Sequence, residues 1–547
     1  MFYQFIIFVL LTSAGFLICR QLLKIPKLSM KKNIKILQAE KEKSSQKLVN
    51  RIIMPLAKPF ARFIPIDPVK EARMASTLRR GGLELLRKVD PYNNYYFVIR
   101  DEESRKHLHN INIYNMVGEY LRETEGLTCT DGYFDRHWPE QLCRFDESGM
   151  YKDPNCPILY DLTTRCQIQI MLEYGYRGKY FEQIDLRLKK AGLYTLFMQS
   201  SAFELPYGGR SNQFLFNEAL IAANCEYEAK RYKNLGDLKT AGMFKRCGHL
   251  SIKAIQRWLK ETEPPRHIKN FYPLESKYGT EDYGYYDKYM VTLGCFIYIA
   301  FLASDDSIEE YPCPAETGGY VFETSRAFHK IFANCRGNFI EIDTAADFHY
   351  DSTGLGRFHK TGFPTELALS MPFTATPNYR LPDRLLKKNA SICPGWESED
   401  GKIHYLSELN EGLEHHLSIS SSDTEKVVFA LTYTGDVFEG CRGIKESYVL
   451  DGEGISIEAE LIEPKVERIH YAVPLFVTNG RDKASLVKGE ERIQVKLGND
   501  VYIVSSDGSL HMEEDLLGNR NGEYKLADLR SESRKIYVYL SLEHDNI

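Results

Sequence analysis

Several motifs that mark common enzyme classes are missing from this sequence. It has no P-loop, no HExxH and no GxSxG segment, and the glycines at 354 and 356 lack the third glycine of a dinucleotide-binding fingerprint. Its twelve cysteines stand singly, without a CxxC pair, so neither a zinc site nor a disulfide framework is indicated. We interpret the cysteines as small hydrophobic residues of the interior.

One segment of the 547-residue chain carries an excess of basic residues, and the remainder has a net negative charge. Residues 20–90 carry 18 Lys and Arg against 6 Asp and Glu, while the net charge of the whole chain is −5, which leaves about −17 for the remainder. Such an acidic remainder, without a nucleic-acid-binding motif, excludes nucleic acid as an expected partner. The length indicates two or three domains, and 43% hydrophobic with 27% charged residues is typical of a globular protein.

One long uncharged run stands at residues 2–19, interrupted only by Gln4, and it is long enough to span a bilayer as a helix. A secretory signal is the alternative, but no Lys or Arg precedes the run and no small-residue cleavage site follows it. The basic residues Arg20, Lys24 and Lys27 follow the run. The positive-inside rule then favours a membrane anchor at residues 1–20 with the rest on the cytoplasmic side; a secreted or cell-surface protein is the alternative.

Residues 21–90 are predicted to form a basic, helical arm. Residues 49–86, with MPLAKPF at 54–60 and LRRGGL at 78–83, resemble the membrane-proximal arm of type II secretion F-family proteins. No further pair of apolar spans follows, so the resemblance does not extend to secretion.

The remaining sequence changes its periodicity near residue 337. Before it, helical spacing predicts helices at 161–174, 181–198, 212–232, 241–262 and 285–304, hence an antiparallel helical domain at 91–335. After it, Ile455, Ile457, Ala459 and Leu461 alternate with polar residues. Further strands are predicted at 427–433, 468–477, 493–497, 501–504 and 536–542. The predicted class is α+β multidomain: membrane helix, basic arm, helical domain, and an antiparallel β-sandwich at 336–547.

Two polar clusters, one in each of these domains, indicate a binding site. Residues 207–219 (YGGRSNQFLFNEA) place Arg210 and Asn212 behind a glycine turn at the predicted start of a helix, where donors suit an anionic ligand. Residues 347–354 (DFHYDSTG) place His349 and Tyr350 together, on what we expect to be a strand. We therefore expect one cleft between the two domains.

The chain from about residue 92 onward resembles the polysaccharide lyases of the heparinase II/III and alginate lyase type. These have an (α/α) toroid and a β-sandwich, and a rhamnose-glucuronate lyase is a possible closer match. Residues 211–217 are similar to the helix start whose Asn binds the uronate carboxylate, although Gln213 stands where His is common. Residues 278–289 (YGTEDYGYYDKY) resemble the segment with the acid/base Tyr. Residues 348–351 (FHYD) resemble the segment with a His of the β domain.

The chemistry implied by the resemblance is β-elimination. A base removes the proton at C5 of a uronate, an acid protonates the oxygen leaving C4, and donors neutralise the carboxylate; one such donor is typically worth ~10²–10³ in rate. The expected catalytic residues are Asn212, His349, Tyr283, Tyr285, Tyr286 and Tyr350. The expected substrate-binding residues are Tyr207, Arg210, Gln213, Asn217, Glu218 and Arg357. A Tyr can act as base where a nearby cation lowers its pKa. The expected partners are an anionic carbohydrate and, through the N-terminus, a membrane.

Each of these residues also has a purely structural interpretation. The turn at 208–212 can be a helix cap in which Arg210 forms an ion pair. Glu218 can be an acidic residue in the first turn of the helix, where it interacts with the helix dipole. The tyrosines at 283–289 can be packing residues in a chain with 35 Tyr, and His349 a structural hydrogen-bonder. No cofactor is expected. A divalent metal held by Asp347, His349 and Asp351 is the alternative, but their spacing is unspecific.

Two other functions fit the sequence. A glycoside hydrolase on a helical toroid, of the unsaturated-glucuronide type, would need paired carboxylates, for which Asp161, Glu218, Glu281 and Asp282 are available. A non-catalytic carbohydrate-binding or membrane-scaffold protein would use aromatic platforms alone. The sugar, the linkage, endo or exo action and the oligomeric state stay open.

The N-terminal run generates a first prediction. Because residues 2–19 are uncharged and are followed by positive charge, the full-length chain should sediment with membranes. A chain that begins at Asp90 should remain in the soluble fraction. Fractionation with detection of both termini measures this, and a full-length protein that is soluble and intact at Met1 would contradict it.

Overall fold

The computed structural model describes residues 109–545 apart from 128 and 286–287. The chain forms two compact units, Met1–Arg105 with Asn115–Phe134, and Lys106–Tyr114 with Asp135–Ile547. The predicted anchor and basic arm lie outside the described residues. Of the helices that the structure does describe, none is long and apolar enough to cross a membrane.

Little of the first unit is described. It includes most of α7 (Asn110–Thr124) and the start of α8 (Tyr133–Leu142). Arg122 pairs with Glu119 at 2.5 Å on α7. The Glu123 carboxylate accepts hydrogen bonds from the backbone N–H of Thr130 at 3.0 Å and from its hydroxyl at 2.6 Å, which fixes the turn between the two helices.

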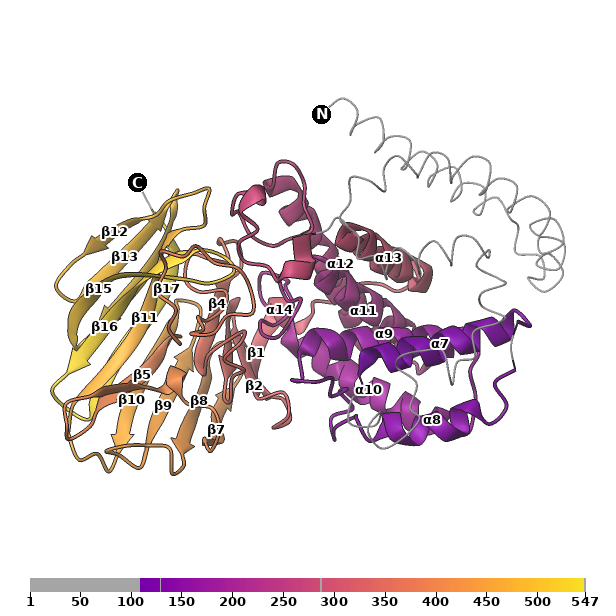
Figure 1. Cartoon of the computed structure of the whole chain (residues 1–547), viewed down its shortest axis with the longest axis horizontal. Coiled ribbons are helices and arrows are strands. Elements are labelled where there is room, and N and C mark those ends of the chain that lie inside the picture. Colours follow the sequence, from indigo (N-terminus) through magenta and orange to yellow (C-terminus); the bar gives the residue numbers. More distant parts are fainter. Residues whose placement is uncertain (1–108, 128, 286–287, 546–547) are drawn as a thin grey trace. The chain divides into compact units, whose positions relative to one another are not determined.

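Antiparallel helices make up the first part of the second unit (Figure 1). They are α9 (Ile158–Glu173), α10 (Phe181–Met198), α11 (Phe216–Asn234), α12 (Leu238–Glu261) and α13 (Lys288–Ala303), with the short η2 (Leu274–Ser276), η3 (Asp282–Tyr285) and α14 (Pro314–Thr317). The five predicted helices are confirmed to within four residues at each end. Helix α11 packs against α9, α12 and α13 and is buried on nearly all sides, as expected for a central helix.

The α11–α12 connection shows how local sequence sets these boundaries. Gly236 follows the end of α11 with φ 81°, the left-handed conformation that closes a helix and favours glycine. Asp237 then caps α12, because its carboxylate accepts the backbone N–H of Thr240 at 3.0 Å.

Three antiparallel sheets make up the rest of the second unit. The strands of the first, in order, are β1 (Gly318–Glu323), β2 (Lys330–Cys335), β3 (Asn338–Asp343) and β4 (Gly354–Lys360). The second runs β12 (Ser485–Lys488), β13 (Arg492–Leu497), β14 (Asp500–Ser506), β17 (Lys535–His544), β10 (Ile455–Ile462), β9 (Gly443–Leu450), β8 (Val427–Thr434), β7 (Glu414–Ser422). The third runs β15 (Ser509–Gly518), β16 (Glu523–Ser531), β11 (Ile469–Thr478), β5 (Cys393–Glu397), β6 (Ile403–Tyr405). The short η4 (Leu406–Glu408) follows β6.

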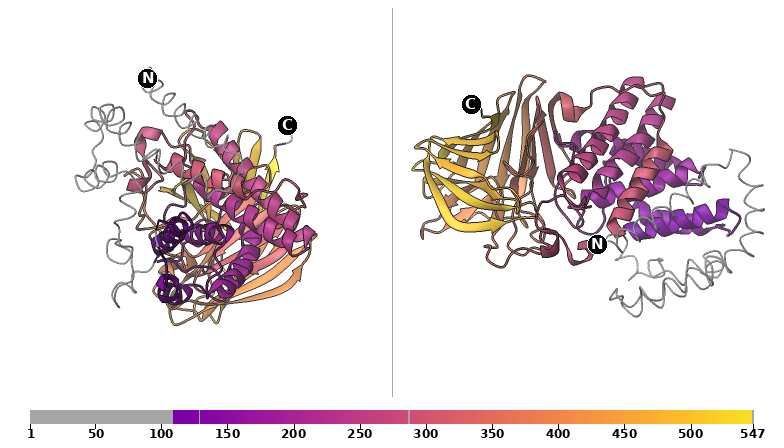
Figure 2. Two further views of the ribbon diagram at one scale, coloured as in Figure 1. Left: turned by 90° about the vertical axis from the view of Figure 1, so that its right-hand side faces the viewer. Right: turned by 90° about the horizontal axis from the view of Figure 1, so that it is seen from above.

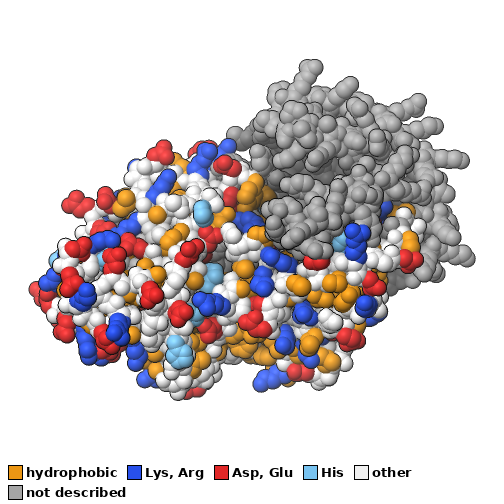
Figure 3. All heavy atoms as spheres, turned by 60° about the horizontal axis from the view of Figure 1, so that its bottom comes forward, with side chains coloured by type: hydrophobic (Ala, Val, Ile, Leu, Met, Phe, Trp, Pro, Cys, Tyr) orange, Lys and Arg blue, Asp and Glu red, His pale blue; other side chains and the backbone are white. Residues whose placement is uncertain are grey.

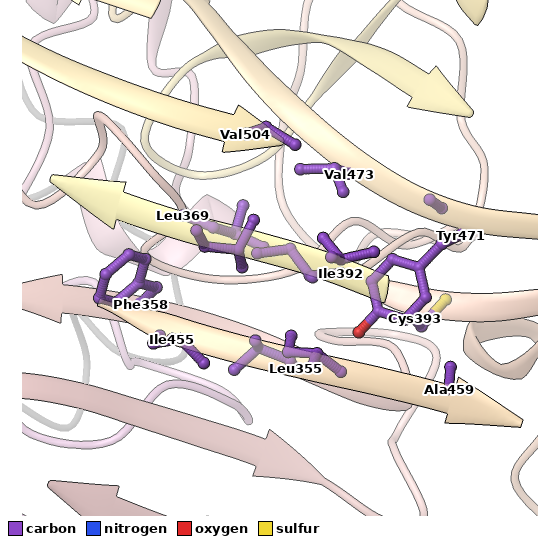
Figure 4. Close-up of a cluster of buried hydrophobic side chains, with 14 of the residues drawn as sticks. Leu355, Phe358, Leu369, Ile392, Cys393, Ile455, Ala459, Tyr471, Val473 and Val504 are labelled. Atoms are coloured by element: carbon purple, nitrogen blue, oxygen red, sulfur yellow. The ribbon is translucent and has the colours of Figure 1, made fainter. Parts of the chain in front are cut away.

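The second and third sheets form the predicted β-sandwich around one core. On β10, Ile455, Ile457, Ala459 and Leu461 are buried and the residues between them are not, so the predicted alternation is confirmed. Figure 4 shows Ile455 and Ala459 of this strand facing Val473 and Tyr471 of β11. The five predicted strands correspond to β8, β11, β13, β14 and β17.

Sheet β1–β4 lies between the helices and the sandwich (Figures 1 and 2). Ile331 and Ala333 of β2 belong to the hydrophobic core of the sandwich, while Phe332, between them, belongs to the core of the helices. On β3, Phe339 likewise faces the helical core and Ile340 the sandwich. This sheet is therefore buried on both faces.

The predicted boundary at residue 336 differs from this arrangement, because β1 and β2 lie before it. All six residues of β2 are buried. A strand with both faces buried lacks polar residues at alternate positions, so the period of two on which the prediction depended is absent there.

The surface mixes charges of both signs. On the face shown in Figure 3, basic and acidic side chains are interspersed over the β part of the second unit. Seven of the described cysteines are buried, as the sequence indicated, and all the described cysteines are free thiols: Cys129, Cys143, Cys156, Cys166, Cys225, Cys247, Cys295, Cys313, Cys335, Cys393 and Cys441.

The sandwich core contains one carboxylate without a cation partner among the described residues. Glu446 of β9 is fully buried and accepts a hydrogen bond from the Tyr471 hydroxyl at 2.9 Å. Burial raises the pKa of Glu446 to about 7, although the Tyr471 and Tyr448 hydroxyls act in the opposite direction. The folded protein therefore favours the neutral acid.

This carboxylate predicts a pH-dependent stability. Because the folded pKa of Glu446 is above its unfolded value, its contribution is fully present below about pH 4.5 and is lost as pH rises through about 7. Glu446→Gln keeps the neutral state at all pH values, so it should gain roughly 2–4 kcal/mol relative to the native protein between pH 4 and pH 8. Urea denaturation across this range measures the difference. Glu458→Gln, on the exposed face of β10, is the control and should change little, and parallel pH curves for Glu446→Gln and the native protein would contradict the assignment.

Candidate active site

The glycine turn lies immediately before α11 and adopts a conformation that glycine favours. Gly208 and Gly209 have φ of 101° and 74°, and Ser211 has φ of 62°. A left-handed residue other than glycine costs on the order of 1–3 kcal/mol and persists where its surroundings hold it. Here the Glu281 carboxylate accepts the backbone N–H of Ser211 at 2.7 Å.

Asn212 lies in this turn and not in the helix, because α11 begins only at Phe216. The prediction that Asn212 starts the helix is therefore wrong. Its amide donates to the carbonyl of Pro206 at 2.6 Å, while Asn217 of α11 donates to the carbonyl of Asn212 at 2.6 Å. Side-chain amides bonded to turn carbonyls outcompete the helical hydrogen bonds that the sequence pattern suggested.

Arg210 stands at the edge of the site with part of its charge already matched. Its guanidinium pairs with Asp153, donates to the Pro154 carbonyl at 2.9 Å and lies 4.1 Å from the centroid of the Tyr160 ring. About a quarter of the side chain remains exposed (26%), so it can still meet a ligand.

A chain of hydroxyl groups connects three segments beside Arg210. The Ser211 hydroxyl lies 3.0 Å from that of Tyr160 on α9 and 2.8 Å from that of Tyr283 in η3. Burial, followed by the Glu281 carboxylate, raises the pKa of Tyr283. Tyr283 therefore lacks the lowered pKa that would let a tyrosine act as a base at neutral pH, and its hydroxyl stays protonated.

Arg520, which the sequence prediction missed, contacts both Glu281 and the glycine turn. It is fully buried in the β15–β16 loop and pairs with both oxygens of Glu281, at 3.0 and 3.2 Å. It also donates to the Gly209 carbonyl at 3.3 Å and lies 4.6 and 5.6 Å from the ring centroids of Tyr379 and Tyr350. No sequence motif surrounds Arg520. Its role is visible only in the folded structure, because Glu281 lies 239 residues away in the sequence.

The second polar cluster is a loop and not the strand that was predicted. Residues 344–353 connect β3 to β4, and Asp347 folds them into a turn by accepting the backbone N–H of His349 at 3.1 Å. The imidazole of His349 lies 3.0 Å from the same carboxylate and is largely exposed. Asn155 donates to the other oxygen of Asp347 at 3.1 Å, which brings this loop to the helical side as expected.

A buried ion cluster lies directly behind the glycine turn. Lys330 of β2 pairs with Asp343 at 2.8 Å, and lies 3.9 Å from Asp351 and 3.4 Å from the centroid of the Tyr207 ring. Burial raises the pKa of Asp351 to about 7, Asp343 raises it further and Lys330 opposes both. A side chain at Gly208 would meet the Asp351 carboxylate, since an added Cβ would lie 2.5 Å from it.

Five of the predicted substrate-binding residues are buried and already bonded within the protein. Glu218 pairs with Lys269 at 2.7 Å and Arg357 with Glu341 at 3.1 Å. Tyr207 donates its backbone N–H to Glu341 at 3.2 Å, and Gln213 donates to the Lys269 carbonyl. At exposures of 0–2%, Tyr207, Gln213, Asn217, Glu218 and Arg357 position the turn, and Asn212, at 4%, is nearly as buried.

The remaining predictions concern Tyr285, Tyr286 and a metal. Tyr286 and the side chain of Tyr285 lie outside the described residues. Asp351 lies 3.9 Å from Lys330, and His349 pairs with Asp347. Within residues 109–545, where described, no group of three or more His, Cys, Asp or Glu is arranged to hold a metal ion.

Comparisons with known proteins concern the fold. No protein-family model matches the sequence, and no curated protein matches it. The chain is similar to the solved structure of heparinase III, with 8% identity, a TM-score of 0.34 and coverage of 80% of this chain and 69% of that chain. It is similar to heparan sulfate lyase HepC from Pedobacter heparinus, with 9% identity, a TM-score of 0.29 and coverage of 88% and 84%. It is also similar to the chondroitin AC lyase of Streptomyces coelicolor A3 in complex with chondroitin sulphate (10% identity, TM-score 0.41, coverage 91% and 66%).

The toroid-plus-sandwich polysaccharide lyases that the sequence resembles are thus also among its structural neighbours. At these identities and TM-scores the similarity assigns no role to any residue of this chain, and the roles of individual residues depend on its own contacts.

The Arg520–Glu281 pair yields a stability prediction. Arg520→Met leaves the Glu281 carboxylate buried without its cation, which should cost about 3–5 kcal/mol. The double variant Arg520→Met with Glu281→Gln should recover part of this loss, because no uncompensated charge remains. Chemical denaturation measures both. Arg442→Met, which breaks an exposed pair with Glu463, is the control and should cost less than about 1 kcal/mol; an equally small effect of Arg520→Met would contradict the role of Arg520.

Proposed function

We propose that this chain is a lyase that cleaves a uronate-containing glycan by β-elimination. The observation that supports this most is the Tyr160–Ser211–Tyr283 hydroxyl chain, which lies beside Asn212 and Arg210. Hydroxyl groups and neutral or cationic donors are the residue types that elimination needs. The polysaccharide-lyase resemblance of residues 211–217 and 348–351 points to the same chemistry.

The donors meet the substrate carboxylate in this proposal. Arg210 offers the exposed part of its guanidinium, and the amide of Asn212 has a second N–H beyond the one that bonds Pro206. Together they stabilise the negative charge that grows on the carboxylate as the C5–H bond breaks. Arg520 has its charge matched by Glu281, so it positions the turn and does not bind the substrate.

Proton transfer is divided between the two polar clusters. His349, exposed and oriented by Asp347, takes the C5 proton. Tyr283 is protonated at neutral pH, and its hydroxyl, which lies 2.8 Å from that of Ser211, donates a proton to the departing O4. The electron pair of the broken C5–H bond forms the C4–C5 double bond, and the C4–O bond breaks. Tyr350, next to Arg520, is the second candidate on the β side, and Tyr285 and Tyr286 remain candidates for the acid.

The hydrolase alternative is less well supported, because three of its four carboxylates are committed. Asp161 pairs with Arg165 at 2.7 Å, Glu218 with Lys269 at 2.7 Å and Glu281 with Arg520 at 3.0 Å, all of them buried. Asp282 is 88% exposed. Hydrolysis requires two carboxyl groups that flank one glycosidic bond, roughly 5–10 Å apart. A non-catalytic carbohydrate-binding protein would keep binding without any turnover.

A screen of uronate-containing glycans with the full chain tests the proposal. Elimination leaves a double bond conjugated to the carboxylate, so the product should absorb in the ultraviolet and the two fragments should together have the mass of the substrate. Hydrolysis would add the mass of one water and no absorbance. Hydrolytic products, or the absence of any product from all the uronate glycans, would contradict the lyase assignment.

Three variants test the assigned roles once a substrate is known. Asn212→Ala should lower kcat by about 10²-fold or more. His349→Ala and Tyr283→Phe should each lower kcat by roughly 10²–10⁴-fold, with a smaller effect on KM, because they remove proton transfer. The matched controls are His416→Ala on β7 and Tyr298→Phe on α13, both exposed.

Melting temperatures separate these roles from structural ones. If Asn212 only holds the turn through the Pro206 carbonyl, Asn212→Ala should cost about 0.5–1.5 kcal/mol of stability and leave kcat unchanged. That pattern would remove Asn212 from the catalytic site.

A further inference from the structure

A second cleft, of about 770 Å³, opens on the same unit and shares no lining residue with the candidate active site. We call it the distal cleft. Its volume is in the usual range for sites that bind small molecules. It is lined by the end of α12 (Arg257, Trp258 and Glu261), by Phe271, and by three loops of the β part: residues 362–366, 481–483 and 497–500.

The segment at residues 269–272 connects the distal cleft to the candidate active site. The carbonyl of Lys269 accepts a hydrogen bond from Asn521 at 3.2 Å, and the Tyr272 hydroxyl donates to the Asn519 carbonyl at 3.4 Å. These bonds fix both neighbours of Arg520 against the segment that presents Phe271 to the cleft.

Most charges that line the cleft are matched by a partner. Asp482 pairs with Arg481 at 2.7 Å, Arg257 with Glu204 at 2.6 Å, and Asp500 lies 2.8 Å from the ring nitrogen of His544. Glu366 is buried and accepts the amide of Asn479 at 2.8 Å. Among the described lining residues, Lys483 and Glu261 remain without a side-chain partner, and their charges are opposite. The cleft thus offers many hydrogen-bonding groups and little net charge.

Apolar surfaces alternate with these polar groups. The Arg481 guanidinium lies 3.7 Å from the centroid of the Phe271 ring, and Trp258 packs against the same ring at 5.1 Å. Phe363 stacks on His544 at 4.5 Å between ring centroids, and Pro364 and Leu497 complete the wall. Paired charges beside apolar faces suit a ligand with many hydroxyl groups, apolar C–H faces and no charge.

We propose that the distal cleft binds an uncharged sugar stretch of the same glycan whose uronate is cleaved at the candidate active site. The link to one glycan rests on the proposed function, whereas the preference for uncharged sugar follows from the cleft alone. A phosphate or a second uronate would find no net positive charge there, and a fully apolar ligand would remove water from the paired charges without offering them any hydrogen bond.

Calorimetric titration of the full chain with neutral di- to hexasaccharides of glucose, galactose, mannose and rhamnose tests this binding. At least one series should bind, and Arg481→Ala should weaken it about tenfold or more, because a stacked hydrogen-bond donor is lost. Lys483→Trp places a bulky ring at the rim and should have the same effect. Lys445→Trp, exposed on β9, is the matched control, and melting temperatures confirm that each variant folds.

The outcomes separate the distal cleft from the lyase assignment. The proposal is supported if both cleft variants lose binding of the neutral oligosaccharide and still turn over a minimal uronate disaccharide. Binding of a neutral oligosaccharide without turnover of any uronate glycan would support the proposal for the distal cleft and contradict the lyase assignment. The absence of neutral binding, equal binding in the variants, or tighter binding of glucuronate oligomers by the cleft would overturn the proposal.

Discussion

The two-faced burial of sheet β1–β4 is the constraint on which the rest of the second unit depends. Alternate residues of β2 enter different cores, Phe332 that of the helices and Ile331 that of the sandwich. The same sheet carries Lys330, Glu341 and Asp343, all of them buried. A buried charge without a partner costs several kcal/mol, so these groups are stable only if the segments around them supply the opposite charge or a hydrogen bond.

The helical side supplies those partners through the glycine turn. The Tyr207 ring covers Lys330, its backbone N–H bonds Glu341, and Arg357 of β4 donates to the Leu205 carbonyl at 2.8 Å. The turn that carries Arg210 and Asn212 is therefore held by the ion cluster behind it. Its position follows from electrostatics in the interior as much as from the start of α11.

The sequence predicted β10 from its polar alternation, which is local and appears in the structure as expected. The strand β2 was missed because all six of its residues are buried, so polar residues do not alternate there. Helical periodicity extended α11 too far, to Asn212, for a different reason: the side-chain amides of Asn212 and Asn217 bond backbone carbonyls of the turn before the helix.

The sequence pointed to two polar segments, around Asn212 and His349, because each has a distinctive local sequence, and it did not predict the contacts that hold them. No local sequence reveals that Arg520 and Glu281 meet across 239 positions, since such a pair exists only after the sheets have formed. The sequence also does not show which polar residues bond within the protein. Glu218 and Arg357 resemble ligand-binding residues, but both are buried in ion pairs.

This division between committed and accessible groups limits the chemistry that the site can perform. The carboxylates Asp161, Glu218 and Glu281 are buried and paired with cations, so they do not face a ligand. The His349 imidazole is exposed, and the partly buried hydroxyls of Tyr160 and Tyr283 meet at the Ser211 hydroxyl. With these groups beside a partly exposed guanidinium, the site fits the proposed elimination better than hydrolysis between two carboxylates.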